Sequence, residues 1–316
     1  MISKRTLLIL GAGASMPYGF PSGTELAKQI KSGLSTQQDR FCTDVMSACG
    51  CTWEVVDNFR SKFDASKATT IDEFLASETE DIVKIGKVCI ARALIPCEIS
   101  AKLSRQDSEQ DSEDERWYAQ FFEKLLSSDA GKFPQNKLSV ITYNYDRSFE
   151  QCLFSTIREK YKLMDDMKTR EVFNKYVDII HLHGVLGELP GLSLKETSRP
   201  YSPKVTDKLL RDAANQIVVI HEVNTDWLSQ HGFPTAQNRI DNANVVCFLG
   251  FGYKDKLLEY IFQKRTSYAQ SEYKDEMLGT CVGVALDQQT EIKARFAKLE
   301  LSNLTVINAM KQWGKI

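Results

Sequence analysis

An unbroken apolar run that ends in a glycine pair opens the chain. Residues 6–10 read Thr-Leu-Leu-Ile-Leu, and Gly11 and Gly13 follow directly. A run without polar alternation is typical of a strand that is buried on both faces, as in a parallel sheet. Residues 22–25 then form a capping-box pattern, which predicts that a helix begins there. This order of strand, glycine loop and helix points to an α/β architecture.

Further apolar runs of strand length recur along the chain, with helical stretches between most of them. They lie at residues 137–142, 177–182, 217–220, 244–249, 280–286 and 304–307. Apolar strands that alternate with helices indicate a parallel sheet covered on both faces. We therefore expect an α/β fold, in which a Rossmann-like parallel sheet carries helices on both faces and an inserted helical subdomain.

The insertion is predicted at residues 36–135, where helical periodicity replaces strand-like runs. Residues 1–35 and 136–316 would then form one Rossmann-like domain. Within the insertion, residues 106–115 contain six acidic side chains and no basic one. Such a run is typical of a solvated loop or a link between helices, and an acidic docking patch is the alternative.

Charge and hydropathy exclude several classes of protein. The 316 residues include 40 Lys and Arg against 42 Asp and Glu, a formal net charge of −2 that gives no bulk attraction to nucleic acid or anionic membranes. The apolar run 7–10 is too short for a signal peptide, and no later stretch approaches the ~18 apolar residues of a membrane span. We expect a cytoplasmic protein with no membrane partner and no direct binding of nucleic acid.

The eight cysteines predict buried, reduced thiols, because several of them lie inside apolar segments. Cys49 and Cys51 form the tightest pair, and their spacing is one residue short of the C-x-x-C of a zinc knuckle. No second pair exists in the sequence. We therefore expect no structural zinc and no other metal.

Glycines follow two of the predicted strands, at the strand ends where open α/β sheets bind ligands. Residues 11–15 could let the backbone approach a phosphate, although Met16 stands where a dehydrogenase fingerprint requires glycine. Residues 250–252 (Gly-Phe-Gly) could hold the far half of a dinucleotide. In both places a tight turn without a ligand is the alternative.

Polar side chains follow two other predicted strands. Asn144 and Asp146 place an amide and a carboxylate at one strand end, or they serve only as turn formers. His181 and His183 alternate at the next strand end, where His183 suits a general base or an acceptor for a bound sugar. His181 is interpreted as a packed, supporting residue. The two remaining histidines, His221 and His231, are interpreted as structural.

These stretches, taken in this order, resemble the Sir2 superfamily and, within it, bacterial Sir2-like proteins of antiphage defence. The motifs G-A-G-A-S, Pro-Ser, T-x-N-Y-D, H-G and a late glycine turn all have counterparts in this chain. The counterparts are Gly11–Ser15, Pro21-Ser22, Thr142–Asp146, His183-Gly184 and Gly250–Gly252. They span both ends of the chain and leave the insertion unmatched. The resemblance implies a Rossmann-like site for NAD+.

The same resemblance implies a role for each matched residue. Asn144 would hold the nicotinamide ribose or the attacking water, Asp146 would meet the carboxamide, and His183 would be the catalytic histidine. Residues 283–287 would close on the adenosine half. The other implied contacts are Gly11, Ala12, Gly13 and Ser15 at the phosphates and ribose, Pro21, Ser22 and Thr142 in the adjoining motifs, and Gly250, Phe251 and Gly252 at the adenosine half.

One departure from the family changes the expected reaction. Protein deacylases of the superfamily carry four zinc-binding cysteines after the H-G motif, and here no cysteine lies between Cys152 and Cys247. Without that module, water is the expected acceptor, so the prediction is an NAD+ glycohydrolase that releases nicotinamide and ADP-ribose with no metal. A sensor that binds NAD+ or ADP-ribose without turnover is the alternative, and a deacylase is disfavoured.

A toxic NAD+ hydrolase has to be kept silent until it is needed. Room for a regulator exists only in the insertion, so control by self-association or by a second protein is expected. Similar proteins, implied by the resemblance to act in antiphage defence by depleting NAD+, pair with HerA-type hexameric ATPases that move on DNA. We therefore expect a homo-oligomer, with a HerA-type ATPase or another defence protein as a possible partner.

Overall fold

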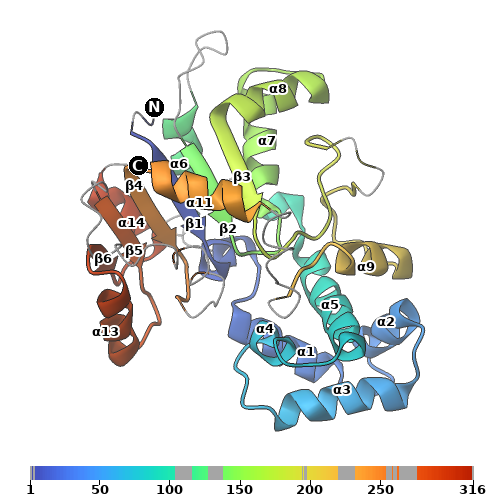
Figure 1. The fold of residues 1–316 in the computed structure, drawn as a ribbon. Coiled ribbons are helices and arrows are strands. Elements are labelled where there is room, and N and C mark those ends of the chain that lie inside the picture. The colour runs from blue at the N-terminus through green and yellow to red at the C-terminus, as the bar shows by residue number, and fades with distance from the viewer. Residues whose placement is uncertain are drawn as a thin grey trace.

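A six-stranded sheet lies at the centre of the computed structural model, which describes residues 2, 4–103, 116–126, 138–193, 195, 198–219, 232–253, 258, 262 and 276–314. All paired strands are parallel, in the order β3-β2-β1-β4-β5-β6 (Figure 1). The order reverses between β1 and β4, which is the position where doubly wound sheets bind ligands. The predicted Rossmann-like fold is confirmed. The strands are β1 (Thr6–Leu10), β2 (Leu138–Thr142), β3 (Val177–His181), β4 (Val245–Leu249), β5 (Glu276–Thr280) and β6 (Leu299–Ser302).

The first four of these strands agree with the sequence prediction, and three other predicted strands are wrong. Residues 280–286 form a turn rather than a strand after Thr280, because Gly283 adopts a left-handed φ of 76° and α13 (Leu286–Arg295) follows. Residues 304–307 run into α14 (Val306–Trp313). In the segment 217–220, Ile217 makes only an isolated bridge to Gly184, and residue 220 lies outside the described residues.

Helices cover both faces of the sheet. One face packs against α6 (Trp117–Leu125), α7 (Ser148–Lys160), α8 (Asp166–Tyr176) and α14, and the other packs against α11 (Phe233–Asn242) and α13. Along β1, Leu8 and Leu10 enter the first core while Leu7 and Ile9 enter the second. Every residue of β1 is therefore buried, which is why its sequence is an unbroken apolar run.

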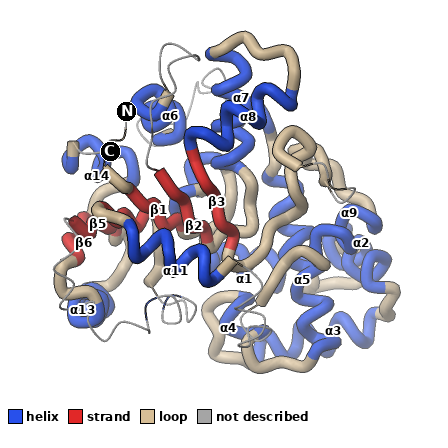
Figure 2. Tube along the Cα trace, turned by 45° about the horizontal axis from the view of Figure 1, so that its top comes forward, coloured by secondary structure: helices blue, strands red, loops and turns tan. Residues whose placement is uncertain are grey.

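The remaining helices pack on one another beside the sheet (Figure 2). The predicted capping box is present at the first of them, where Ser22 Oγ accepts from Glu25 N and Glu25 Oε2 accepts from Ser22 N. Both α1 and α9 contact α5, although the predicted insertion at 36–135 contains neither, so the domain boundaries stay an interpretation. The group comprises α1 (Gly23–Gly33), α2 (Arg40–Cys49), α3 (Trp53–Ala65), α4 (Ile71–Leu75), α5 (Glu80–Leu94) and α9 (Asp207–Ala214). Within the described part of the chain, no helix is long and apolar enough to cross a membrane.

Two glycine turns meet backbone to backbone where β1 and β4 end. Gly11 N donates to Leu249 O at 3.0 Å, and Gly13 N donates to Gly250 O at 2.9 Å. A Cβ on Gly11 would lie 2.6 Å from Gly250 O, and one on Gly250 would lie 2.1 Å from Ala14 N. Gly250 also has a left-handed φ of 58°. Only glycine fits such a contact, so these residues are required by the fold itself.

This contact predicts that Gly250→Ala strongly destabilises the protein. Left-handed strain costs about 1–2 kcal/mol and forced overpacking adds about 1–3 kcal/mol, so urea denaturation should show a loss of roughly 2–5 kcal/mol. Gly50→Ala is the matched control, because Gly50 has a similar φ of 65° but no atom within 4 Å of the added Cβ. Equal losses in the two variants would show that the turns do not depend on their close approach.

Candidate active site

The glycine loop after β1 is closed on itself. A short 3-10 helix (Ala12–Ala14) follows Gly11, and a second one (Met16–Tyr18) separates it from α1. Ala14 N donates to Gly11 O and Ser15 N donates to Ala12 O, so these two backbone donors, like Gly13 N, are engaged within the protein. The long helix α1 therefore does not begin at the glycine loop, as a dinucleotide fingerprint would require. Its first turn is capped by Ser22, which follows Pro21.

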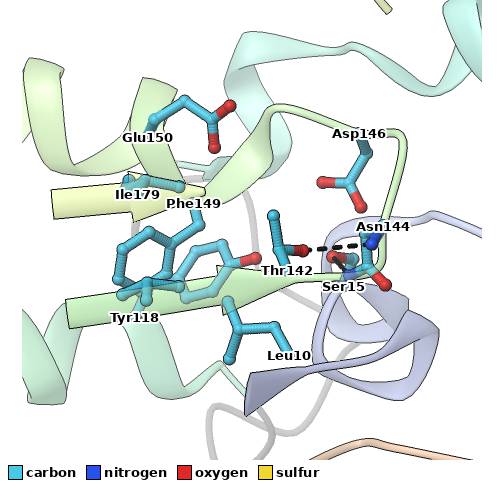
Figure 3. A pocket seen from close by; sticks show the side chains of 10 residues that line it. Leu10, Ser15, Tyr118, Thr142, Asn144, Asp146, Phe149, Glu150 and Ile179 are labelled. Carbon is cyan, nitrogen blue, oxygen red and sulfur yellow. Dashed lines mark hydrogen bonds between the residues drawn. The ribbon is translucent and has the colours of Figure 1, made fainter. Parts of the chain in front are cut away.

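Asn144 lies at the end of β2 with its side chain turned toward the glycine loop (Figure 3). Its Nδ2 donates to Gly11 O at 3.0 Å and to Ser15 Oγ at 3.1 Å, and its backbone N donates to Thr142 Oγ1 at 3.1 Å. A backbone carbonyl can only accept, so the atom beside Gly11 O must be the amide nitrogen. Both amide hydrogens are thus directed into the protein, which leaves Oδ1 as the atom that can meet a ligand.

Asp146 lies in a buried hydrogen-bond network rather than at the surface. Its Oδ1 accepts from Ser148 N at 2.9 Å and from Ser148 Oγ, and Ser148 Oγ also lies 3.4 Å from Ser15 Oγ. Burial raises the pKa of Asp146, although the bonds from Ser148 and Ser15 act in the opposite direction. Through Ser148 and Ser15, this carboxylate supports the orientation of the Asn144 amide.

His183 follows β3 and packs against the two tyrosines that flank Asn144. Its ring centroid lies 5.7 Å from that of Tyr143 and 5.8 Å from that of Tyr145, and the side chain is buried. Nδ1 lies 3.3 Å from Val218 O, which can only accept a hydrogen bond. The neutral ring therefore carries its proton on Nδ1 and its acceptor lone pair on Nε2, the tautomer that a general base at Nε2 requires.

His181 contacts the backbone of Asn144 and a carboxylate on α7. From the sequence, we interpret it as a packed, supporting residue. Its Nδ1 lies 3.2 Å from Asn144 O, and its Nε2 lies 2.9 Å from Glu150 Oε1. Burial lowers the pKa of His181, but the Glu150 carboxylate, the Asn144 carbonyl and the charge of Asp146 outweigh it and raise the pKa overall. The sequence did not predict a role for Glu150 in the site. The available signal was its position four residues after Asp146, in the first turn of α7.

Two residues that precede β2 in the chain, Glu98 and Trp117, reach the site directly, which the sequence did not reveal. Trp117 Nε1 donates to Ala14 O in the glycine loop at 2.9 Å. The buried Glu98 carboxylate pairs with Arg147, the residue after Asp146, at 2.6 Å, and with Arg199 at 2.7 Å. A buried charge with two partners fixes the segments that carry those partners. Trp117 therefore holds the glycine loop, and Glu98 holds the segment that follows β2.

The late glycine turn borders the site from β4. The Phe251 ring packs edge-on against Tyr143, with centroids 4.8 Å apart, and it belongs to the core beneath the sheet. A Cβ on Gly252 would meet no atom within 4 Å, so that position is open. Among the described residues no group of His, Cys, Asp and Glu could hold a metal ion. His221, His231 and the acidic stretch 106–115 lie outside the described residues.

The raised pKa of His181 predicts a pH-dependent contribution to stability. A group whose pKa is raised on folding stabilises the protein fully below its unfolded pKa, and the effect is lost as pH rises through the folded pKa. In urea denaturation at pH 6, His181→Asn should lower the free energy of unfolding by about 2 kcal/mol, typical of a hydrogen bond to a charged group. At pH 9 the loss should be smaller.

Glu150→Gln provides the background that tests the cause of this effect. In that background the effect of His181→Asn should no longer change between pH 6 and pH 9, because Glu150 is the charge that mainly raises the pKa. A loss that stays constant with pH in the wild-type background, or that grows at pH 9, would contradict the assignment.

Comparison with known proteins gives one match and one negative result. The model of the SIR2-like domain family matches residues 138–298, just over half of the chain. This range contains Asn144, Asp146, His183 and the turn at 250–252, whereas the glycine loop after β1 precedes it. No curated protein matches the chain. On the strength of this match and of the fold that carries it, the chain belongs to the SIR2-like family.

Proposed function

We propose that this protein is an NAD+ glycohydrolase, which cleaves NAD+ to nicotinamide and ADP-ribose. Membership of the SIR2-like family indicates an NAD-related function and fits an NAD-utilising enzyme. The observation that carries the finer proposal is the orientation of Asn144. Its amide nitrogen is bonded inward to Gly11 and Ser15, and it stands beside the strand pair where the sheet order reverses.

The chemistry needs little from the protein beyond orientation and charge stabilisation. The bond between ribose C1′ and the pyridinium nitrogen breaks with its electron pair going to nicotinamide, which leaves as a neutral molecule. A water oxygen then bonds to C1′ of the oxocarbenium-like ribose, and the proton of that water passes to His183 Nε2. Asn144 Oδ1 would orient this water or the ribose hydroxyls.

Asp146 enters this proposal in two ways. Its bonds from Ser148, whose Oγ lies 3.4 Å from Ser15 Oγ, support a role in holding Asn144. The contact with the nicotinamide carboxamide, which the family resemblance implies, remains a separate prediction. The same applies to the phosphate contacts of the glycine loop, because the N–H groups of Gly13, Ala14 and Ser15 are bonded within the protein.

The reaction predicts products that need no peptide acceptor. Incubation with NAD+ should yield free nicotinamide and ADP-ribose on chromatography. Asn144→Ala and His183→Ala should each lower the rate by ~10²–10⁴-fold, the usual range for a lost general base or orienting group. Asn242→Ala, on the exposed end of α11, is the control and should keep the wild-type rate.

Two outcomes would overturn the proposal. Binding of NAD+ by calorimetry without any cleavage would favour a sensor. Equal cleavage by wild type and by Asn144→Ala would place the activity outside this site.

We also propose that the enzyme acts in the cytoplasm in antiphage defence, with its activity held in check by assembly. Light scattering at micromolar concentration should then give a mass above that of one 35.8 kDa chain. Affinity purification from the native host should retain a second protein, with a HerA-type ATPase as the expected class. A monomer that purifies alone would contradict control by assembly.

A further inference from the structure

Tyr118 reaches the candidate active site from outside the segment that matches the SIR2-like family. It lies on α6, whereas the match begins at residue 138. Its side chain is fully buried, and its ring stacks on Tyr18 with centroids 3.8 Å apart and planes 6° apart. Its backbone N also donates to Tyr18 Oη at 2.7 Å. The hydroxyl is therefore held in one place by contacts on both its ring and its backbone.

A continuous chain of hydrogen bonds leads from this hydroxyl to Asn144. Tyr118 Oη lies 2.7 Å from Ser148 Oγ, and Ser148 Oγ bonds onward to Asp146 Oδ1. Ser15 Oγ lies 3.4 Å from Ser148 Oγ and accepts from Asn144 Nδ2 at 3.1 Å. The side chains of Tyr118, Asp146, Ser15 and Asn144 line one cavity (Figure 3). The volume of this cavity is about 10 Å³.

The direction of these bonds follows from the groups themselves. Burial raises the pKa of Tyr118 well above its usual range, so the phenol keeps its proton and can donate it to Ser148 Oγ. Ser148 has one hydroxyl hydrogen, and the Asp146 carboxylate takes it. Each hydroxyl that accepts from one side donates to the other, so removal of the first donor weakens the hydrogen bonds that follow it in the chain.

We propose that Tyr118 is a positioning residue, which fixes the orientation of Asn144 through Ser148, Asp146 and Ser15. The inference rests on the proposed hydrolysis for its kinetic readout. It makes α6 a part of the site that sequence similarity to the family does not cover. It also identifies a path from α6 to the site, since anything that shifts α6 shifts the first donor of the chain.

The kinetic test uses Tyr118→Phe, which removes the hydroxyl and keeps the stacked ring. We expect kcat for NAD+ cleavage to fall by about 10- to 100-fold, as a displaced orienting group does, with little change in KM. Tyr176→Phe is the matched control, because Tyr176 is also buried and its hydroxyl bonds to that of Tyr161 at 2.7 Å. Tyr176 ends α8, directly before the first residue of β3, and the site lies at the other end of that strand. A kcat for Tyr118→Phe equal to that of the control would overturn the inference.

A double-variant comparison separates positioning from general packing. If Tyr118 acts through Asn144, Tyr118→Phe should change nothing further in the Asn144→Ala background. If it acts only on packing, the two losses should multiply, and that outcome would contradict the proposal. Ser148→Ala, which breaks the chain at its next link, should reproduce the kcat loss and covers the case in which Tyr118→Phe does not fold.

A spectroscopic readout keeps the inference testable if the proposed hydrolysis fails. In ¹⁵N-labelled protein, the side-chain amide signals of Asn144 can be assigned by their loss in Asn144→Ala. Tyr118→Phe should shift or broaden these signals, and Tyr176→Phe should leave them unchanged. Unchanged Asn144 signals in Tyr118→Phe would overturn the positioning role, whether or not the wild-type protein cleaves NAD+.

Discussion

The contact between two glycine turns is the constraint on which the rest of this site depends. Gly13 N bonds to Gly250 O, and added Cβ atoms on Gly11 or Gly250 would collide with the facing backbone. This contact ties the end of β1 to the end of β4 at the point where the strand order reverses. It also fixes the Gly11 carbonyl, which accepts from Asn144 Nδ2. Gly11 and Gly250 are therefore needed first for close packing of the two turns, and that packing fixes the carbonyl to which Asn144 bonds.

Around that contact the site is held from several sides at once. Ser15 and Gly11 hold the Asn144 amide, His181 and Thr142 hold its backbone, and Glu98 holds the neighbouring segment through Arg147. Interlocked polar networks of this kind keep one geometry because each group is worth more when its neighbours are in place. A glycosidic bond to a pyridinium needs mainly such fixed orientation, which is why we favour hydrolysis of NAD+ for this member of the SIR2-like family.

Local pattern predicted the central sheet well and its C-terminal edge poorly. The strands β1 to β4 are apolar runs that end in a glycine or a polar turn, so their signal is contained in a few adjacent residues. Residues 280–286 and 304–307 are equally apolar, but tertiary packing uses them as a turn and as a helix start. Asn144 and His183 could be selected from the sequence as strand-end residues. Two residues that support the site could not be selected: Tyr118, which bonds to Ser148, and Glu98, which pairs with Arg147, lie far from Asn144 and His183 along the chain, and only the fold brings them to the site.

A structure of the His183→Ala variant with NAD+ bound would test the central claim most directly. We expect the nicotinamide ribose to lie against Asn144 Oδ1, with the Asn144 amide nitrogen still bonded to Gly11 O and Ser15 Oγ. We also expect the space vacated by the His183 ring to face C1′ of that ribose. NAD+ bound away from the ends of β1, β2 and β4, or an Asn144 side chain turned over with its nitrogen toward the ligand, would contradict the account.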